Sequence, residues 1–343
     1  MSSTDPLSLS TPSGRPAPRA ALRLPRPGDR LVIGGLVLAV GLGLAGLISA
    51  TGWHEIGTQL ARLSLGQMAL LLLLSLVNYG LRGLRWHVLA RRLGLPTTLR
   101  QNLRHYLGGF AMAVTPGRLG ELVRMRWLRR ETGWAVERTA PLALMDRAGD
   151  LAVMALLLGA ATLLAGRGQA GLSAALPVTV VGLLAAVLLT RPQVLALILT
   201  RAYRLTGWKP GLFARARRAS RSLARFSDPM TLLGVLGLGL CGWLAEGYAF
   251  HLLVGWMGAD IGLWTAIGIF TFATLAGGLT GAPGGLGGAE AAMVALLSLN
   301  GVGLEVSVPA TAVIRLTTLW FALALGLAVF PLAEARAMAA PLP

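Results

Sequence analysis

The sequence predicts an all-α integral membrane protein with about six full spans and two oppositely oriented re-entrant helical hairpins arranged as an inverted repeat. Of 343 residues, 55% are hydrophobic and 13% are charged, whereas about a quarter of the residues of a soluble domain carry charge. Several apolar windows of about twenty residues are long enough to cross a bilayer as helices. Two Pro-Gly breaks, "TPGRLGE" and "GAPGG", interrupt this apolar sequence, one in each half.

The N-terminal region combines a polar tail with an apolar run. Residues 1–30 are rich in Pro, Ser and Arg, a composition typical of a disordered basic tail. The apolar run 31–51 is long enough to span a bilayer, so we interpret it as an uncleaved signal-anchor helix. Residues 31–335 then form a single polytopic domain in the plasma (inner) membrane of a prokaryote. Cys241 is the single cysteine, which excludes an intramolecular disulfide.

The arginines predict how each span is oriented, because short cytoplasmic loops carry an excess of Lys and Arg. The segment 191–228 contains nine Arg or Lys residues, whereas the loops near 167, 260 and 302 contain Arg167 alone among strong bases. We therefore expect the basic segment and both termini in the cytoplasm. This placement accounts for the net charge of +17 without a nucleic-acid partner. The remaining spans are expected at 67–81, 150–165, 171–190, 229–254 and 308–333.

Arginines 215, 218, 221 and 225 follow helical spacing within the basic segment. They predict either a helix lying on anionic lipid or a solvated loop that obeys the topology rule. The same segment is also a possible docking site for a lipid-modifying enzyme.

The first break lies in a segment with cytoplasmic features on both sides. Its apolar part, "YLGGFAMAV", is too short to cross, and it has Arg104 before it and Arg124, Arg126, Arg129 and Arg130 after it. Residues 103–130 are therefore expected to dip into the membrane and turn back at Pro116 and Gly117. Such a turn is tolerated only where protein or a water-filled cavity satisfies the exposed backbone.

The second break is expected to mirror the first. Residues 263–299 would enter from outside, turn at Pro283, Gly284 and Gly285, and leave outside. Two alternatives remain: both hairpins could be full spans, and the glycines could serve only close helix packing.

Landmarks of the two halves keep nearly constant separations. Gly94 to Gly258 spans 164 positions, Arg147 to Arg315 spans 168 and Glu121 to Glu290 spans 169, by subtraction. The predicted units cover about 67–165 and 229–333 and are joined by 191–228. Paired broken segments in inverted repeats are typical of transporters, whose binding site lies at the breaks.

Charges within the spans indicate the chemistry of that site. Each costs about 2.5–3.5 kcal/mol at the bilayer centre, so such charges should pair or line a cavity. In "LMDRAGDL", residues 146, 147 and 150 share a helix face, and a half-helix starting near Gly117 with Arg118 beside it would attract phosphate. Further buried charges are expected at Arg82, Arg85 and Glu246. The residues expected to bind an anionic, phosphate-bearing lipid headgroup are Arg118, Glu121, Asp146, Arg147, Asp150, Glu290 and Arg315.

Catalytic patterns are scarce. The four histidines lack the spacing of a local metal motif, and no Gly-Lys-Ser/Thr follows the glycine-rich break. No nucleophile with an adjacent base can be identified. We therefore expect no enzymatic activity, no metal and no cofactor.

Three motifs, "TPGRLGELVR", "LMDRAGDL" and "APGGLGGAE", resemble the transmembrane, flippase-like region of the lysylphosphatidylglycerol synthase family. The resemblance covers about residues 30–335. It implies lipid translocation between leaflets by a stand-alone member without the soluble synthase domain, and family members often have Glu where Asp146 stands. The functional residues that it implies are Pro116, Gly117, Arg118, Glu121, Asp146, Arg147, Pro283, Gly284 and Glu290.

Two other functions remain open from the sequence. One is a non-transporting accessory membrane subunit for a lipid-modifying glycosyl- or aminoacyl-transferase, docked through the basic segment. The other is an intramembrane enzyme that acts on a lipid phosphate.

Overall fold

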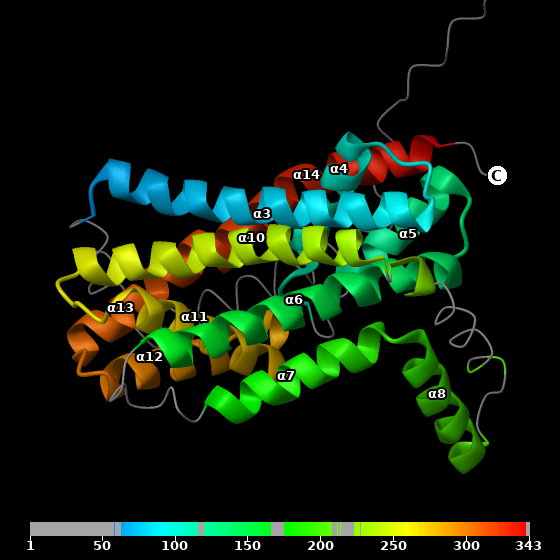
Figure 1. Cartoon of the computed structure of the whole chain (residues 1–343). Coiled ribbons are helices and arrows are strands. Elements are labelled where there is room, and N and C mark those ends of the chain that lie inside the picture. Colours follow the sequence, from blue (N-terminus) through cyan, green and yellow to red (C-terminus); the bar gives the residue numbers. More distant parts are fainter. Residues whose placement is uncertain are drawn as a thin grey trace, which may run out of the picture.

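A computed structural model describes residues 63–115, 120–165, 175–207, 223–226 and 228–340, together with positions 58, 211 and 213. In these residues the fold is all-helical (Figure 1). The predicted tail 1–30 and the predicted span 31–51 lie outside the described residues.

The first half of the described chain begins and ends with a long helix and has a broken pair of helices between them. Its elements are α3 (Leu65–Leu93), α4 (Leu99–Gly108), η1 (Gly109–Met112), α5 (Gly120–Thr132) and α6 (Val136–Leu164). Ser64 caps α3 by accepting a hydrogen bond from the backbone of Gln67, and Gly94 ends the helix with a φ of 87°. Only glycine adopts this left-handed conformation readily, so the chain turns sharply into α4.

The second half repeats this order. Its elements are α10 (Pro229–Trp256), α11 (Leu263–Leu279), η3 (Pro283–Gly285), α12 (Gly288–Leu299), α13 (Leu304–Arg315), the π-helix η4 (Leu316–Trp320) and α14 (Phe321–Ala339). Gly258, with a φ of 91°, follows the end of α10. Between the halves lie α7 (Ala175–Thr190), α8 (Pro192–Thr206) and η2 (Leu223–Phe226). α7 packs on α6, and α8 projects away from the other helices (Figure 1).

Four helices of the described chain are long and apolar enough to cross a membrane: Leu65–Leu93, Val136–Leu164, Pro229–Trp256 and the continuous Leu304–Ala339. α7 is apolar but has only 16 residues. The helix α3 continues to Leu93, beyond the predicted apolar window 67–81, so Arg82 and Arg85 lie within the helix. The helix carries these arginines at buried positions because acidic partners on α6 neutralise them, as described below.

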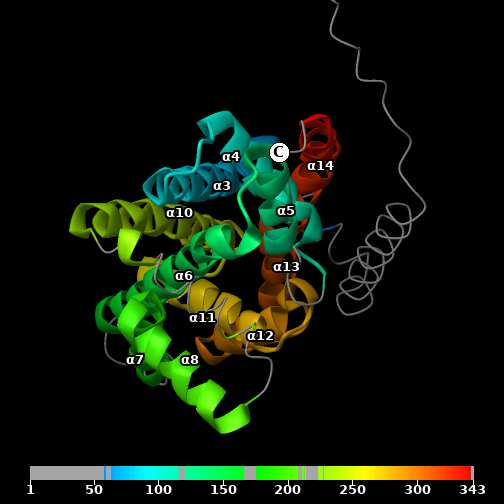
Figure 2. The same cartoon turned by 90° about the vertical axis from the view of Figure 1, so that its right-hand side faces the viewer.

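The two long helices that open the halves lie side by side and run in opposite directions (Figure 1). At their crossing Gly242 of α10 faces Asn78 of α3, and a methyl group added at Gly242 would lie 2.7 Å from the Asn78 side-chain oxygen. A glycine at this point lets the helices approach closely. Viewed along the bundle, α5 lies between α6 and α14 (Figure 2).

The two broken helix pairs approach the middle of the bundle from opposite ends (Figure 1). In each pair, glycines let the two arms meet. A methyl group added at Gly120 would lie 2.4 Å from the Gly109 carbonyl oxygen, and one added at Gly288 would lie 3.4 Å from Cα of Gly277. We call these pairs hairpin 1 (residues 99–132) and hairpin 2 (residues 263–299).

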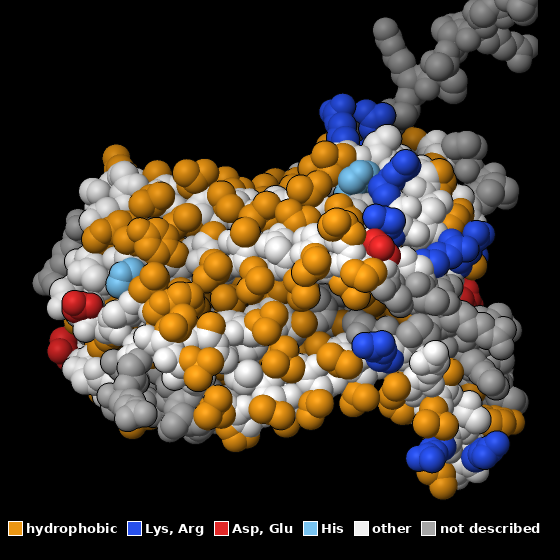
Figure 3. All heavy atoms as spheres, in the orientation of Figure 1, with side chains coloured by type: hydrophobic (Ala, Val, Ile, Leu, Met, Phe, Trp, Pro, Cys, Tyr) orange, Lys and Arg blue, Asp and Glu red, His pale blue; other side chains and the backbone are white. Residues whose placement is uncertain are grey.

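Apolar side chains cover the flank of the bundle, and charged side chains gather at its ends (Figure 3). Lys and Arg side chains are concentrated at the end where α4, α5 and α8 lie. The loops at the other end, 257–262 and 300–303, contain no Lys or Arg. An apolar flank between polar ends is the distribution expected of a membrane-spanning helical protein.

Candidate functional site

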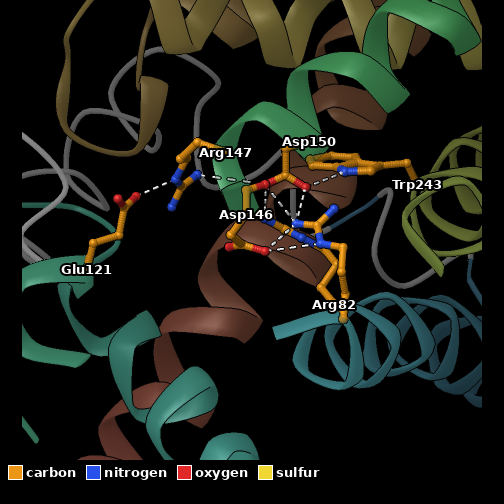
Figure 4. Close-up of polar contacts among 7 residues, drawn as sticks. Arg82, Glu121, Asp146, Arg147, Asp150 and Trp243 are labelled. Atoms are coloured by element: carbon orange, nitrogen blue, oxygen red, sulfur yellow. Dashed lines mark hydrogen bonds and ion pairs between the residues drawn. The ribbon is translucent and has the colours of Figure 1, made fainter. Parts of the chain in front are cut away.

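A cluster of two arginines and two aspartates joins α3 to α6 (Figure 4). Arg85 is fully buried and its Nη2 lies 2.6 Å from Oδ1 of Asp146 and 2.8 Å from Oδ1 of Asp150. Arg82, one helical turn earlier, places its Nη2 2.6 Å from Oδ2 of Asp150. Trp243 of α10 donates its indole N–H to Asp150 over 3.1 Å. Three helices are therefore held together by charges that neutralise one another.

An ion pair ties hairpin 1 to α6. Glu121 lies in the first turn of α5, where the helix dipole favours a negative charge, and its Oε1 contacts Nε of Arg147. Nη1 of Arg147 also lies 3.9 Å from Oδ2 of Asp150. Both members of the pair are partly exposed, unlike Arg85. Arg147 therefore lies between the buried cluster and hairpin 1, with part of its side chain exposed (Figure 4).

A second ion pair ties hairpin 2 to α13. Glu290 lies in the first turn of α12, and its Oε1 is 2.5 Å from Nε of Arg315. Nη2 of Arg315 donates to the carbonyl oxygen of Gly284 over 2.8 Å, so the same arginine also holds the turn of the hairpin. The other carboxylate oxygen of Glu290 is buried and has no hydrogen-bond partner.

The tips of the two hairpins touch. Gly284 and Gly285 form the turn of hairpin 2 with φ values of 63° and 70°. A methyl group added at Gly284 would lie 3.3 Å from Cγ1 of Val114, which precedes the break of hairpin 1. Val114 packs with Trp320 of η4, so the π-helix lies where the hairpins meet. Such π-helical turns are frequent at functional sites.

The two ion pairs belong to a wider set of corresponding contacts. Pro141 lies six residues before Arg147, and Pro309 lies six residues before Arg315, each inside its helix. Tyr79 of α3 donates to the Thr318 carbonyl, as Trp243 of α10 donates to Asp150. Tyr79 and Trp243 are 164 positions apart, and Asp150 and Thr318 are 168 apart, the separations of Gly94 from Gly258 and of Arg147 from Arg315.

The structure brings most of the predicted binding residues into ion pairs. Asp146, Arg147 and Asp150 lie together on α6, and Arg147 reaches Glu121, whereas Glu290 and Arg315 form a separate pair. Pro283, Gly284 and Gly285 lie at the turn of hairpin 2. Pro116, Gly117 and Arg118 lie outside the described residues, and the described part of α5 begins at Gly120.

Two arginines make contacts that the sequence did not indicate. Arg124 was expected as a cytoplasmic residue flanking hairpin 1, but it is buried against aromatic rings because α5 packs inside the bundle. Arg225, expected either on anionic lipid or in a solvated loop, is exposed, and its Nη1 donates to the Leu93 carbonyl over 2.7 Å at the end of α3. Arginines 215, 218 and 221 lie outside the described residues.

The predicted set of binding residues omitted three side chains of the buried cluster, Arg82, Arg85 and Trp243. Arg85 was expected only as a buried charge, yet it pairs with both aspartates of α6. Its three-residue spacing from Arg82 on one helix could have indicated a shared partner. Trp243 contacts Asp150, which lies 93 residues away in the sequence, and no local sequence pattern predicts that contact.

No group of three or more His, Cys, Asp or Glu side chains in the described parts of the chain is arranged to bind a metal ion. The ionisable side chains near the hairpin tips are instead mostly arginines and carboxylates in pairs. Such a set can hold a charged group by exchanging an internal partner for an external one.

Comparison with known proteins identifies the family. The family model described as "Lysylphosphatidylglycerol synthase TM region" matches residues 31–326. A UPF0104 membrane protein of Methanothermobacter thermautotrophicus is 27% identical over 325 residues, which cover 87% of this chain and 95% of the relative. The match includes both hairpins and all the ion pairs described above. The chain therefore belongs to the family of the transmembrane region of lysylphosphatidylglycerol synthases.

Proposed function

We propose that the protein moves an anionic, phosphate-bearing lipid between the two leaflets of a membrane. The observation that supports this best is the pair of corresponding ion pairs, Glu121 with Arg147 and Glu290 with Arg315, one beside each hairpin. In each pair the carboxylate forms an ion pair with an arginine, and an arginine is also suited to bind a phosphate. The membrane-domain family is consistent with this role.

In this proposal the two halves form an inverted repeat and the hairpins are re-entrant. Hairpin 1 enters from the end rich in Lys and Arg, which we place in the cytoplasm of a prokaryotic cell. Hairpin 2 enters from the other side. Broken helices that meet near the midplane are where transporters of this kind bind their substrate, and the contact between Gly284 and Val114 supports such a meeting point.

Translocation would proceed by exchange of partners. A lipid phosphate that enters from one side takes the place of one carboxylate on its arginine, and the second pair offers an equivalent site toward the other side. The acyl chains remain in the surrounding lipid. The arginine stays paired with an anion throughout, which avoids the cost of an isolated cation in the membrane.

The direct test is leaflet exchange of a fluorescent phosphatidylglycerol in proteoliposomes, measured by quencher accessibility. The native chain should accelerate exchange over protein-free vesicles, and both Arg147→Ala and Arg315→Ala should slow it at least tenfold. Arg138→Ala is the matched control, because Arg138 lies on the same helix as Arg147 but stacks on Trp134 outside the site. It should retain the native rate.

Two results would count against the proposal. Native exchange at the rate of protein-free vesicles, for several anionic lipids, would favour the accessory-subunit function. Native rates in both arginine variants would show that exchange does not use these pairs.

A further inference from the structure

Among the residues that the structure describes, Arg124 of α5 is a buried cation without a counter-ion. Only 3% of its surface is exposed. The guanidinium carbon lies 4.1 Å from the ring centroid of Tyr106, 5.4 Å from that of Trp86 and 5.8 Å from that of Phe110. Its Nε and Nη1 are buried and make no hydrogen bond. In the described residues no carboxylate forms an ion pair with it.

The other arginines near the hairpins are compensated. Arg82 and Arg85 pair with aspartates of α6, and Arg147 and Arg315 pair with the hairpin glutamates. Stacking on aromatic faces offsets part of the cost of burying a cation. It does not satisfy the N–H donors, and a buried donor without an acceptor destabilises the fold. Arg124 is therefore arranged to receive an acceptor that the described chain does not supply.

The position of Arg124 connects it to the site. It lies one helical turn after Glu121, whose carboxylate pairs with Arg147. The backbone of η1 passes directly over it, since a methyl group added at Gly109 would lie 2.3 Å from Nε of Arg124. The guanidinium is thus enclosed between the two arms of hairpin 1, beside the Glu121–Arg147 pair.

We propose that Arg124 is an anion-binding residue that takes the phosphate group of a phospholipid within hairpin 1. The inference rests on the proposed function and adds a second arginine to the Arg147 position. A phosphate diester offers oxygen acceptors to the free donors and supplies the missing negative charge. The aromatic rings hold the guanidinium in place while the site is empty.

This role has a stability signature that a packing role lacks. Replacement by glutamine removes an uncompensated buried charge, so Arg124→Gln should unfold at a higher temperature than the native chain when only uncharged lipid is present. It should bind phosphatidylglycerol at least tenfold more weakly, because the counter-charge for the phosphate is gone. Arg124→Lys keeps the charge and should retain binding in part.

The experiment measures thermal unfolding of the full chain in uncharged detergent with added phosphatidylglycerol, diacylglycerol or inorganic phosphate. Phosphatidylglycerol should stabilise the native chain and diacylglycerol should not. Stabilisation by inorganic phosphate alone would support the anion site and assign it to a free anion. Arg126→Gln is the matched control on the same helix, because Arg126 pairs with Glu334 at the end of the bundle; it should keep the native response.

Arg124→Gln that unfolds at a lower temperature and keeps the full response to phosphatidylglycerol would overturn the inference and leave Arg124 a packing residue. The binding test is independent of leaflet exchange. Lipid binding that depends on Arg124 in a protein without exchange activity would contradict only the proposed function. Exchange that is lost in Arg147→Ala but native in Arg124→Gln, with unchanged binding, would contradict only the present inference.

Discussion

At the scale of single residues, the arginines of this protein differ in burial and in whether a ligand could replace their ion-pair partner. Arg85 is enclosed by two aspartates and has no exposed surface. Arg147 is partly exposed and is held by one glutamate from a hairpin. A buried cluster whose charges balance fixes the relative positions of helices, whereas a partly exposed pair can open. In the proposed function, Arg85 therefore holds the helices together and Arg147 contacts the lipid.

Replacement of Arg85 should lower the stability of the fold. Arg85→Ala leaves Asp146 and Asp150 short of a partner in a buried setting, and breaking a buried ion pair costs about 3–5 kcal/mol. Thermal unfolding in detergent should show a large drop. The double variant Arg85→Leu with Asp146→Leu removes opposite charges together and should recover much of the loss. If Arg85→Ala unfolds like the native chain, the cluster does not hold α3 to α6.

Glu131 anchors the base of hairpin 1, outside the four span-length helices. Its Oε1 lies 2.5 Å from Nη2 of Arg104 and 3.1 Å from Nε2 of His105, both on α4. Burial raises the pKa of Glu131, but the contacts from His105 and Arg104 outweigh it, so the pKa lies below its ordinary value. A lowered pKa in the folded state means that ionised Glu131 stabilises the fold above its unfolded-state pKa.

The stabilisation by Glu131 should therefore be present at neutral pH and be lost as the pH falls below about 4.3, the ordinary value for a glutamate. Glu131→Gln should unfold at a lower temperature than the native chain at pH 7, and the difference should shrink as the pH falls toward 3. A difference that is constant with pH would show that the ionised carboxylate does not hold the two helices.

At the scale of elements, the hairpins depend on glycines where their arms cross. Gly120→Ala would bring a methyl group within 2.4 Å of the Gly109 carbonyl oxygen, and backbone cannot move aside as a side chain can. Overpacking of this kind costs about 1–3 kcal/mol. Gly237→Ala is the control, because its methyl group would meet nothing within 4 Å and alanine favours helix.

Gly120→Ala should therefore lower the unfolding temperature and slow leaflet exchange, while Gly237→Ala should leave exchange unchanged and stabilise α10 slightly. Equal unfolding temperatures and equal exchange rates in the two variants would mean that the arms of hairpin 1 are not packed as described.

The elements also show why the apolar window 67–81 stops short of the end of its helix. A window search ends at Arg82 because charge is costly in a bilayer. α3 nonetheless continues to Leu93, since Asp146 and Asp150 on a helix sixty residues later compensate both arginines. Span ends that depend on such distant partners cannot be located from local composition.

At the scale of the whole molecule, the halves match in geometry but differ in charge. Arg82 and Glu246 are separated by the same 164 positions as Gly94 and Gly258, and Asp150 corresponds to Thr318. Half one therefore carries the Arg82, Arg85, Asp146 and Asp150 cluster, and half two does not. The ion pairs beside the hairpins correspond, but the charges around them differ.

The opposed arrangement of the halves predicts labelling from opposite sides. After Cys241→Ser, single cysteines at positions 129 and 305 lie on exposed residues at opposite ends of the bundle. In membrane vesicles an impermeant thiol reagent should label Arg129→Cys only from the cytoplasmic side and Glu305→Cys only from the other side. Labelling of both from one side would contradict the inverted arrangement.

The sequence by itself determined the class of protein, the two breaks, the corresponding Glu and Arg positions and the family, because composition and spacing are local properties of the chain. The tertiary structure decided which charges are partners. It placed Arg85 between two aspartates, brought Trp243 to Asp150, and buried Arg124 among aromatic rings. These contacts depend on how α3, α5, α6 and α10 pack, and packing brings together residues that no local pattern relates.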